Sequence, residues 1–450
     1  MADEVIAADG GRAARHIPGK LTFGLLSLGL LLFFFVLPHT VEGDGRLRFD
    51  ALESWLGGHG IPDVKYPLVG SLPSVPLLLL GRVVATPEWW AARYNVIVFA
   101  AGLILLYRLL RGRVASDVLA AFLLLLGTTA MLPNALTEFG AETFSAVTVA
   151  AGLAAWDLGR WKTATVLIAF GVANLPASIV GLALALGWWA WHAKRWRAVF
   201  PIAAAAGLWA LENLVRRGAP LVSGYQGDHG FQTALPFSGL PGFSYPTLFG
   251  SASLVLSFGK GLLFFTPGLF LAFGRGLEAL RGLRPLMVMW MLYLAGMVLV
   301  YGSWWAWYGG FTWGPRFLLF ASAPAALLLA ALVRRPPVKL LPASIVLAAL
   351  LLSLWVGIDG AIFGRFGQST CAANHYALES FCWYVPELSV LWTPFVFQAS
   401  LSWPDLAILA YDLGVVAFVG WPLIIRWRAS ATDGLRATWN AYSSRTAWRF

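Results

Sequence analysis

Apolar runs separated by short polar connections extend along the whole chain. Many approach the length of about 20 residues that crosses the hydrocarbon core of a bilayer as a helix. We expect twelve such spans, to within one or two, because the segment ANLPAS could mark a break at Pro176 inside a single helix. The expected spans are 21–38, 92–110, 116–133, 142–158, 163–175, 177–193, 198–215, 260–278, 285–303, 316–333, 340–358 and 405–425. The pattern therefore predicts an all-α polytopic membrane protein.

Composition supports this class and excludes a water-soluble globular protein. The 450 residues are 59% hydrophobic and only 12% charged, with a mean hydropathy of +0.71, whereas soluble domains are about 25% charged. The first apolar run lies too far from the N-terminus, and is too poorly followed by a small-residue cleavage site, to be a removed signal peptide. We therefore expect it to be a retained first helix.

Basic residues mark one side of the expected membrane. The formal net charge is +10, and most Lys and Arg flank every second connection, as Arg108, Arg111 and Arg113 do. Short cytoplasmic loops carry such an excess, so the charge indicates topology rather than nucleic-acid binding. Both ends of the chain, residues 1–20 and 429–450, are then expected to be cytoplasmic.

The opposite face carries three long segments rich in Gly, Pro, Trp and Tyr. Loops of this length in a compact protein are usually functional, so we expect the site at this outer face. Apolar residues at near-helical spacing in 46–56 predict an interfacial helix. The stretch YPLVGSLPSVPLLLLG, which begins at Tyr66, predicts re-entrant or interfacial structure, and Tyr66 is a candidate for substrate binding. The expected divisions are a catalytic core at 21–335 with outer loops 39–91 and 216–259, and further helices at 336–428 with outer loop 359–404.

Acidic residues directly follow the first span, in HTVEGDGRLRFD. Asp44 lies between two glycines, which allow a tight turn and leave room for a substrate at the membrane boundary. It is our candidate general base, and Glu42 is a candidate for substrate binding. The alternative is that Asp44 only caps the helix that follows.

A second acidic pair, Glu138 and Glu142, lies one helical turn apart where the fourth span begins. The helix dipole favours acids at this position, which would be a purely structural explanation. A carboxylate at membrane depth is otherwise a functional candidate. With Asp44, these residues could divide the base and substrate-binding roles.

Cations occur on the outer face, where the topology rule does not require them. Arg216 and Arg217 end the seventh span, Lys260 stands between two glycines, and Arg316 begins a helix, where the dipole disfavours a cation. An anion held between Lys260, Arg316 and Arg216 would explain these three, and a phosphate is the natural candidate. For the arginine pair, snorkelling to the interface is the alternative.

Aromatic residues crowd the segment before Arg316, WWAWYGGFTWGPRF. Trp307, Tyr308 and Trp313 could bind a sugar ring or an isoprenoid chain, or could belong to an ordinary aromatic belt at the membrane surface. The two cysteines, Cys371 and Cys382, fall in one outer loop and could form a disulfide or remain free thiols. With so few thiols and no clustered histidines, we expect no metal site.

Four short motifs occur in a familiar order: GDG after the first span, AET opening the fourth, SFGKGLLFFTPG opening the eighth, and WWAWYGGFTWGPRF before the tenth. This series resembles bacterial GT-C glycosyltransferases of the protein-mannosyltransferase and aminoarabinose-transferase superfamily, which use polyprenyl-phosphate sugars as donors. The resemblance covers roughly residues 20–335. It implies a GT-C fold in the bacterial inner membrane, with interfacial helices in large periplasmic loops and an active site that faces the periplasm.

The resemblance also implies roles for individual residues. Asp44 matches an acid that acts as catalytic base or binds the acceptor, and Glu142 matches an acid after the third helix. Lys260 and Arg316 match basic residues that face the donor phosphate. The family's usual Asp-Glu pair is replaced here by Glu42-Gly43-Asp44, and no extra soluble domain is present. Both differences favour a lipid or glycan acceptor over protein.

The implied reaction is an inverting substitution at the anomeric carbon. Asp44 would deprotonate an acceptor hydroxyl, and the cations would stabilise charge on the departing lipid phosphate. No cofactor or metal is expected, and we expect a monomer. Two other classes stay open: a transporter or flippase of lipid-linked sugars, and a polysaccharide ligase or polymerase with a lipid pyrophosphate donor. An essential outer-loop histidine, such as His229 or His375, would favour the ligase.

Overall fold

The computed structural model describes residues 19–194, 196–271, 275–310, 312–364, 369–372, 375–396 and 400–446. Within these ranges the chain is helical and forms no β-strand, only isolated bridges. Six of the described helices are long and apolar enough to cross a membrane: Pro87–Leu110, Trp196–Arg217, Leu277–Gly302, Arg316–Arg334, Leu340–Phe363 and Trp403–Asp433. The prediction of an all-α membrane protein is confirmed at this level.

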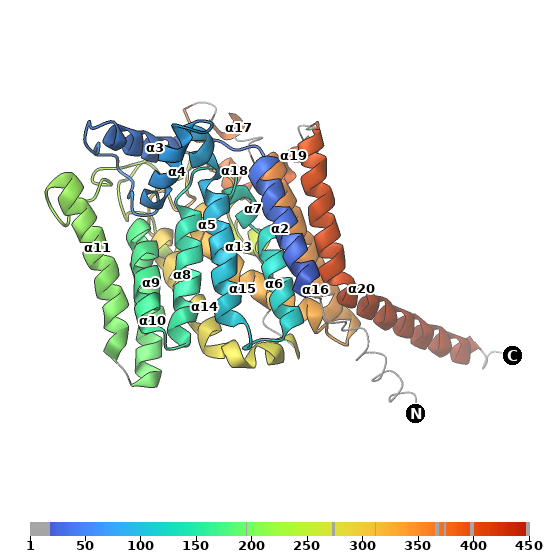
Figure 1. The fold of residues 1–450 in the computed structure, drawn as a ribbon. Helices are drawn as coiled ribbons and strands as arrows, with labels where there is room; N and C mark the ends of the chain where they lie inside the picture. Colours follow the sequence, from blue (N-terminus) through green and yellow to red (C-terminus); the bar gives the residue numbers. More distant parts are fainter. Residues whose placement is uncertain are drawn as a thin grey trace.

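The helices run side by side in one bundle (Figure 1). Their bounds are α2 Gly19–Phe35, α5 Pro87–Leu110, α6 Ser116–Thr128, α7 Leu132–Ala135, α8 Glu142–Asp157, α9 Trp161–Asn174, α10 Ile179–Ala193, α11 Val199–Arg217, α12 Thr247–Leu256, α14 Arg284–Gly302, α15 Ser322–Arg334, α16 Leu340–Ile358 and α20 Trp403–Thr446. Every residue of α15 is buried. A helix that is apolar on all sides is stable only inside a bundle or membrane, so α15 forms the centre of the core.

Short elements gather at one end of the bundle, the top of Figure 1. They are α3 Gly43–Leu56, α4 Val75–Gly81, α17 Ser369–Ala372, α18 Phe381–Tyr384 and α19 Thr393–Val396. The interfacial helix expected at 46–56 is present as α3. It buries Phe49 and Leu52 and exposes Leu47 and Trp55, as an amphipathic helix at a surface does.

The expected span at 260–278 is wrong. The chain instead forms α12, a turn at 257–261, a single helical turn α13 Leu262–Phe265 and the 3₁₀ turn Pro267–Phe270. Gly259 packs so closely on the Cys382 carbonyl that a side chain would overlap it, and the Gly259 amide donates to the Trp383 carbonyl at 3.0 Å. Contacts from the distant 382–383 segment therefore stabilise the break.

Two other boundaries differ from the sequence pattern. Pro176 does separate two helices, α9 and α10, through the 3₁₀ turn Pro176–Ser178. The last helix, α20, continues to Thr446 across Pro422, so the cytoplasmic tail expected at 429–450 is helical as far as it is described, and α20 bends along its length (Figure 1). The expected N-terminal tail lies outside the described residues except for its last two.

Candidate functional site

Backbone geometry brings the GDG motif against the segment before α8. Gly43 has a positive φ of 52°, which glycine adopts without strain, and α3 begins there. Gly45 lies against the Phe139 carbonyl with no room for a side chain. The Thr40 amide donates to Thr137 O at 2.9 Å, and the Phe139 amide donates to Thr40 O at 3.3 Å. These contacts place the first turn of α3 beside residues 137–139.

Asp44 is held as an ionised carboxylate in an ion pair. Its Oδ2 lies 2.7 Å from Nη2 of Arg316, and it accepts a hydrogen bond from the Tyr66 hydroxyl. Burial alone would raise the pKa of Asp44, but Arg316, Tyr66 and Arg48 outweigh it, so the pKa falls below the usual 3.8. The N-cap position belongs to Glu42, without a side-chain cap bond. The idea that Asp44 only caps α3 is therefore wrong.

Arg316 joins Asp44 to the start of α8. Its Nη1 lies 3.7 Å from Oε1 of Glu142, an ion pair longer than a hydrogen bond. Its Nε is buried and has no hydrogen-bond partner among the described residues. The arginine thus keeps donor capacity beyond the bond to Asp44. The sequence placed these three residues in one site, and the structure brings them together from three separate segments.

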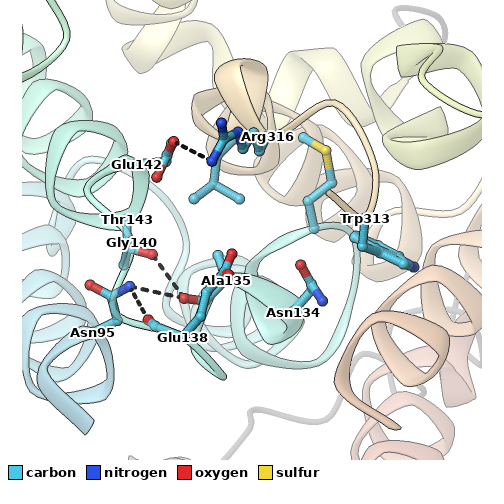
Figure 2. A pocket seen from close by; sticks show the side chains of 11 residues that line it. Asn95, Asn134, Ala135, Glu138, Gly140, Glu142, Thr143, Trp313 and Arg316 are labelled. Carbon is cyan, nitrogen blue, oxygen red and sulfur yellow. Dashed lines mark hydrogen bonds and ion pairs between the residues drawn. The ribbon is translucent and has the colours of Figure 1, made fainter. Parts of the chain in front are cut away.

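A pocket adjoins this cluster (Figure 2). It is a small hollow that is partly open to solvent. The Asn95 amide donates to the carbonyls of Ala135 at 3.0 Å and Glu138 at 2.8 Å, which leaves its buried Oδ1 without a partner in the described structure. The lining residues are Asn95, Met131, Asn134, Ala135, Glu138, Gly140, Glu142, Thr143, Trp313, Arg316 and Leu319. Amides, carboxylates, one guanidinium and an indole suit a small polar ligand with an apolar face.

A second, smaller pocket shares Glu142 and Leu319 with the first. Its walls come from α8, α14 and the segment after Arg316, and include Tyr293, Met297 and Phe317. The surface of both pockets is mostly apolar, but only the first carries two amides, two carboxylates and a guanidinium, and we call it the polar pocket.

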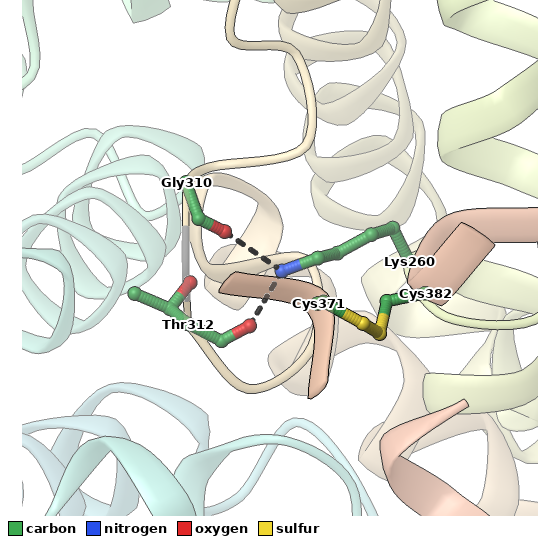
Figure 3. The surroundings of a disulfide bond; sticks show 5 residues. All are labelled: Lys260, Gly310, Thr312, Cys371 and Cys382. Carbon is green, nitrogen blue, oxygen red and sulfur yellow. Dashed lines mark hydrogen bonds between the residues drawn. A yellow bond between two sulfur atoms is a disulfide. The ribbon is translucent and has the colours of Figure 1, made fainter. Parts of the chain in front are cut away.

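Lys260 does not face the pockets. Its ammonium group donates to the carbonyls of Gly310 at 3.3 Å, Thr312 and Gly314 at 3.1 Å, all in the loop that leads to Arg316 (Figure 3). The side chain is buried, and burial lowers its pKa to about 7. In place of the expected phosphate contact, Lys260 binds three carbonyl groups of this loop, which have no helical hydrogen-bond partners. We call this set of bonds the Lys260 clamp.

Arg216 and Arg217 also donate hydrogen bonds to backbone carbonyls. Both donate to the Val64 carbonyl, and Arg216 also donates to Tyr66 O at 2.9 Å and pairs with Glu212 at 2.8 Å. These contacts hold the chain ahead of α4. They do not support a role for either arginine in phosphate binding, and snorkelling does not describe such buried side chains.

The aromatic candidates divide into two groups. Trp313 lines the first pocket, and the Tyr66 hydroxyl donates a hydrogen bond to Asp44. Trp307 is fully buried, while Tyr308 stacks on Trp383 at 3.8 Å and donates to Glu379 at 3.0 Å. The latter pair packs the outer core instead of lining either pocket. Glu42, also expected to bind substrate, is exposed beside the α3 terminus.

Cys371 and Cys382 form a disulfide with a Cα–Cα distance of 6.1 Å, close to the Lys260 clamp (Figure 3). His229 and His375 are both exposed and line neither pocket. Among the described residues, no group of three His, Cys, Asp or Glu side chains could hold a metal ion.

Sequence reasoning missed four residues around the site. Arg48 is buried against Tyr66, at 4.7 Å from the ring centre, and its Nη1 has no partner in the described structure. It lies one helical turn after Asp44, so the helical spacing could have revealed it. Asn95, Asn134 and Asp359 were also missed, although each is a polar residue at the end or interior of an apolar run.

No protein-family model matches the chain, and a search of curated proteins finds no significant match.

Proposed function

We propose that this chain is an inverting glycosyltransferase that transfers a sugar from a polyprenyl-phosphate donor to a hydroxyl of a lipid or glycan acceptor. The observation that carries the proposal is the ion-paired cluster of Asp44, Arg316 and Glu142, in which Arg316 lines the polar pocket, Glu142 lines both pockets, and Asp44 lies behind Arg316. A lipid-linked sugar likewise combines polar and apolar parts, a polar head on a hydrocarbon chain. The proposal includes a GT-C arrangement of about twelve spans in a bacterial inner membrane, with the site at the periplasmic face. The six long apolar helices support its membrane part.

The donor phosphate would be bound by Arg316 and Arg48. Arg316 has donor groups beyond its bond to Asp44, and Arg48 has a buried Nη1 without a described partner. Arginine matches phosphate geometry with parallel N–H groups. This assignment replaces Lys260 and Arg216 by two arginines that act on Asp44. Arg316 pairs with Asp44, and the charge of Arg48 lowers its pKa, although Arg48 also donates to the Pro67 carbonyl at 3.4 Å and lines neither pocket.

In the proposed reaction, the acceptor hydroxyl attacks the anomeric carbon as the bond from that carbon to the phosphate oxygen breaks. The proton passes to Asp44, and polyprenyl phosphate leaves with the bonding electron pair. Arg316 would stabilise the leaving phosphate while it keeps Asp44 ionised. Glu142, at the junction of the pockets, would orient sugar hydroxyls. Trp313 offers an aromatic face to the sugar ring.

The test is mass spectrometry of lipids and envelope glycans from a strain that lacks the gene. The strain is complemented at equal protein levels with the wild type, Asp44→Asn, or Asp50→Asn, which changes an exposed carboxylate of the same helix. We expect the wild type and Asp50→Asn to restore one sugar-modified product and Asp44→Asn to fail.

Full restoration by Asp44→Asn would refute the base role. No sugar difference between the null strain and the complemented strain would refute the transferase proposal. Accumulation of a lipid-linked sugar on the cytoplasmic side would instead support a flippase.

A further inference from the structure

Two residues that line the polar pocket donate hydrogen bonds to a segment late in the chain, on the side facing away from the pocket. The indole Nε1 of Trp313 donates to Oδ2 of Asp359 at 2.7 Å, and the Asn134 amide donates to the Gly360 carbonyl at 2.9 Å. Asp359 and Gly360 open a short π-helix, Asp359–Phe363, at the end of α16. A side chain on Gly360 would lie within about 3 Å of both Trp313 and Asn134. The π-helix therefore contacts the outer side of this pocket wall.

If Asp359 served only to fill space in the core, it would lower the stability of the fold. Asp359 is fully buried, and its Oδ1 has no hydrogen-bond partner among the described residues. A buried carboxyl group with an unused oxygen destabilises a fold compared with an apolar residue of similar size. Single π-helical turns are uncommon and occur often at functional sites. Because Asp412 is equally buried, burial alone does not indicate a function; the π-helical turn together with the bond from Trp313 points to a role in the pocket wall.

The contact fixes the direction of the Trp313 ring. Trp313 is buried, and Phe265 packs edge-on against its indole with ring centres 5.1 Å apart, so packing restrains the ring. The hydrogen bond to Asp359 adds a fixed direction for the indole N–H. Loss of this bond removes the polar contact that selects one orientation of the indole within that packing.

We infer that Asp359 is a positioning residue that orients the Trp313 indole as one wall of the sugar-binding pocket. The C-terminal helices thus complete a site whose other residues lie before residue 335. The sugar-binding part of this inference rests on the proposed function, whereas the orientation of Trp313 does not. The expected signature is weaker donor binding with a smaller effect on turnover, because Asp359 touches no reacting atom.

The orientation is tested by ¹⁹F NMR of the full-length protein in lipid nanodiscs, labelled with 5-fluorotryptophan. The Trp313 signal is assigned from its loss in Trp313→Phe. We expect Asp359→Leu to shift or broaden this signal, and Asp359→Asn, which retains an oxygen acceptor, to leave it near its wild-type position. Asp412→Leu is the matched control, because Asp412 is also a fully buried carboxyl group, but no described hydrogen bond joins it to Trp313. It should not move the Trp313 signal.

The functional part is tested by steady-state kinetics with the donor identified by mass spectrometry. Asp359→Leu should raise the donor KM by about tenfold, the effect of one lost hydrogen bond of ordinary strength, and Asp359→Asn should restore most of it. Trp313→Phe removes the same bond from the other side. The double variant should therefore be no worse than the poorer single variant, and Trp313→Phe still tests the contact if Asp359→Leu does not fold.

Three results would overturn the inference or its basis. An unchanged Trp313 signal in Asp359→Leu refutes the orienting contact. A changed signal with an unchanged donor KM refutes the role in sugar binding. Absence of any transfer by the wild type refutes the proposed function itself, and the ¹⁹F signal alone then decides whether Asp359 orients Trp313.

Discussion

Replacement of Lys260 by Met separates its two candidate roles. Methionine keeps the buried apolar stem of the side chain but removes all three hydrogen bonds to the 310–314 loop. That loop ends at Arg316, which pairs with Asp44 at 2.7 Å. If Lys260 is a clamp, its loss displaces Arg316. If Lys260 binds the donor phosphate, Arg316 stays in place.

The structure indicates a modest change in stability and a large change in activity. Hydrogen bonds from a charged donor stabilise a fold by about 1.5–3 kcal/mol each. Burial, which lowers the Lys260 pKa to about 7, opposes this gain. The net loss of stability in Lys260→Met is therefore on the order of a few kcal/mol. A catalytic group misplaced by about 1 Å can cost on the order of 100-fold in rate.

The assay is the pH dependence of kcat/KM, with thermal unfolding measured in parallel. A displaced Arg316 no longer offsets the burial of Asp44, so the pKa of Asp44 rises and the acid limb of the profile moves to higher pH. Lys162→Met is the control, because Lys162 is exposed on α9 and should leave the profile unchanged.

A different result would refute the clamp. If Lys260→Met raises the donor KM and weakens inhibition by polyprenyl phosphate, but leaves the acid limb where it is, Lys260 contacts the phosphate and the 310–314 loop does not depend on it.

Three further outcomes are expected. Asp44→Asn should lower kcat by about 10²–10⁴-fold with donor binding retained, which a binding assay with labelled donor would check. Arg316→Gln should move the acid limb of the kcat/KM profile to higher pH, because the charge that opposes the effect of burial on the Asp44 pKa is lost. Arg316→Lys keeps a positive charge and should move the limb less. An unmoved limb in Arg316→Gln would contradict the assignment of Asp44 as base. Arg216→Met should lower the free energy of unfolding by about 3–5 kcal/mol by leaving Glu212 buried without its partner. In that case the double variant with Glu212→Leu should recover much of the loss, and equal instability of the two variants would show that the ion pair is not the cause.

Local pattern predicted well the features that depend on local sequence. The amphipathic spacing after Asp44 predicted α3, and the acidic start of the fourth span predicted α8 at Glu142. The failure at 260–278 has a different origin. Its apolar composition suits a helix, but the break at Gly259 is stabilised by backbone contacts with residues 382–383. Pro267 and Gly268, inside the segment, are local helix breakers that the apolar pattern outweighed, and α13 ends just before them. The turn before α13 depends in addition on residues more than 100 positions away, which the segment does not report.

The cations show why the charge of a residue alone did not identify its role. Long outer segments without regular helices leave many carbonyl groups unpaired, and in a buried setting these need donors. Lys260 and Arg216 supply them, so a positive charge on the outer face is explained by backbone demand before any ligand is considered. A buried nitrogen without a described hydrogen-bond partner does not distinguish the candidates, because Arg216 and Arg217 have one as well as Arg316 and Arg48. Arg316 differs because it lines the first pocket and pairs with both Asp44 and Glu142. Position at a pocket beside two carboxylates, and not charge as such, is therefore the property that separates a candidate phosphate ligand from a structural cation in this protein.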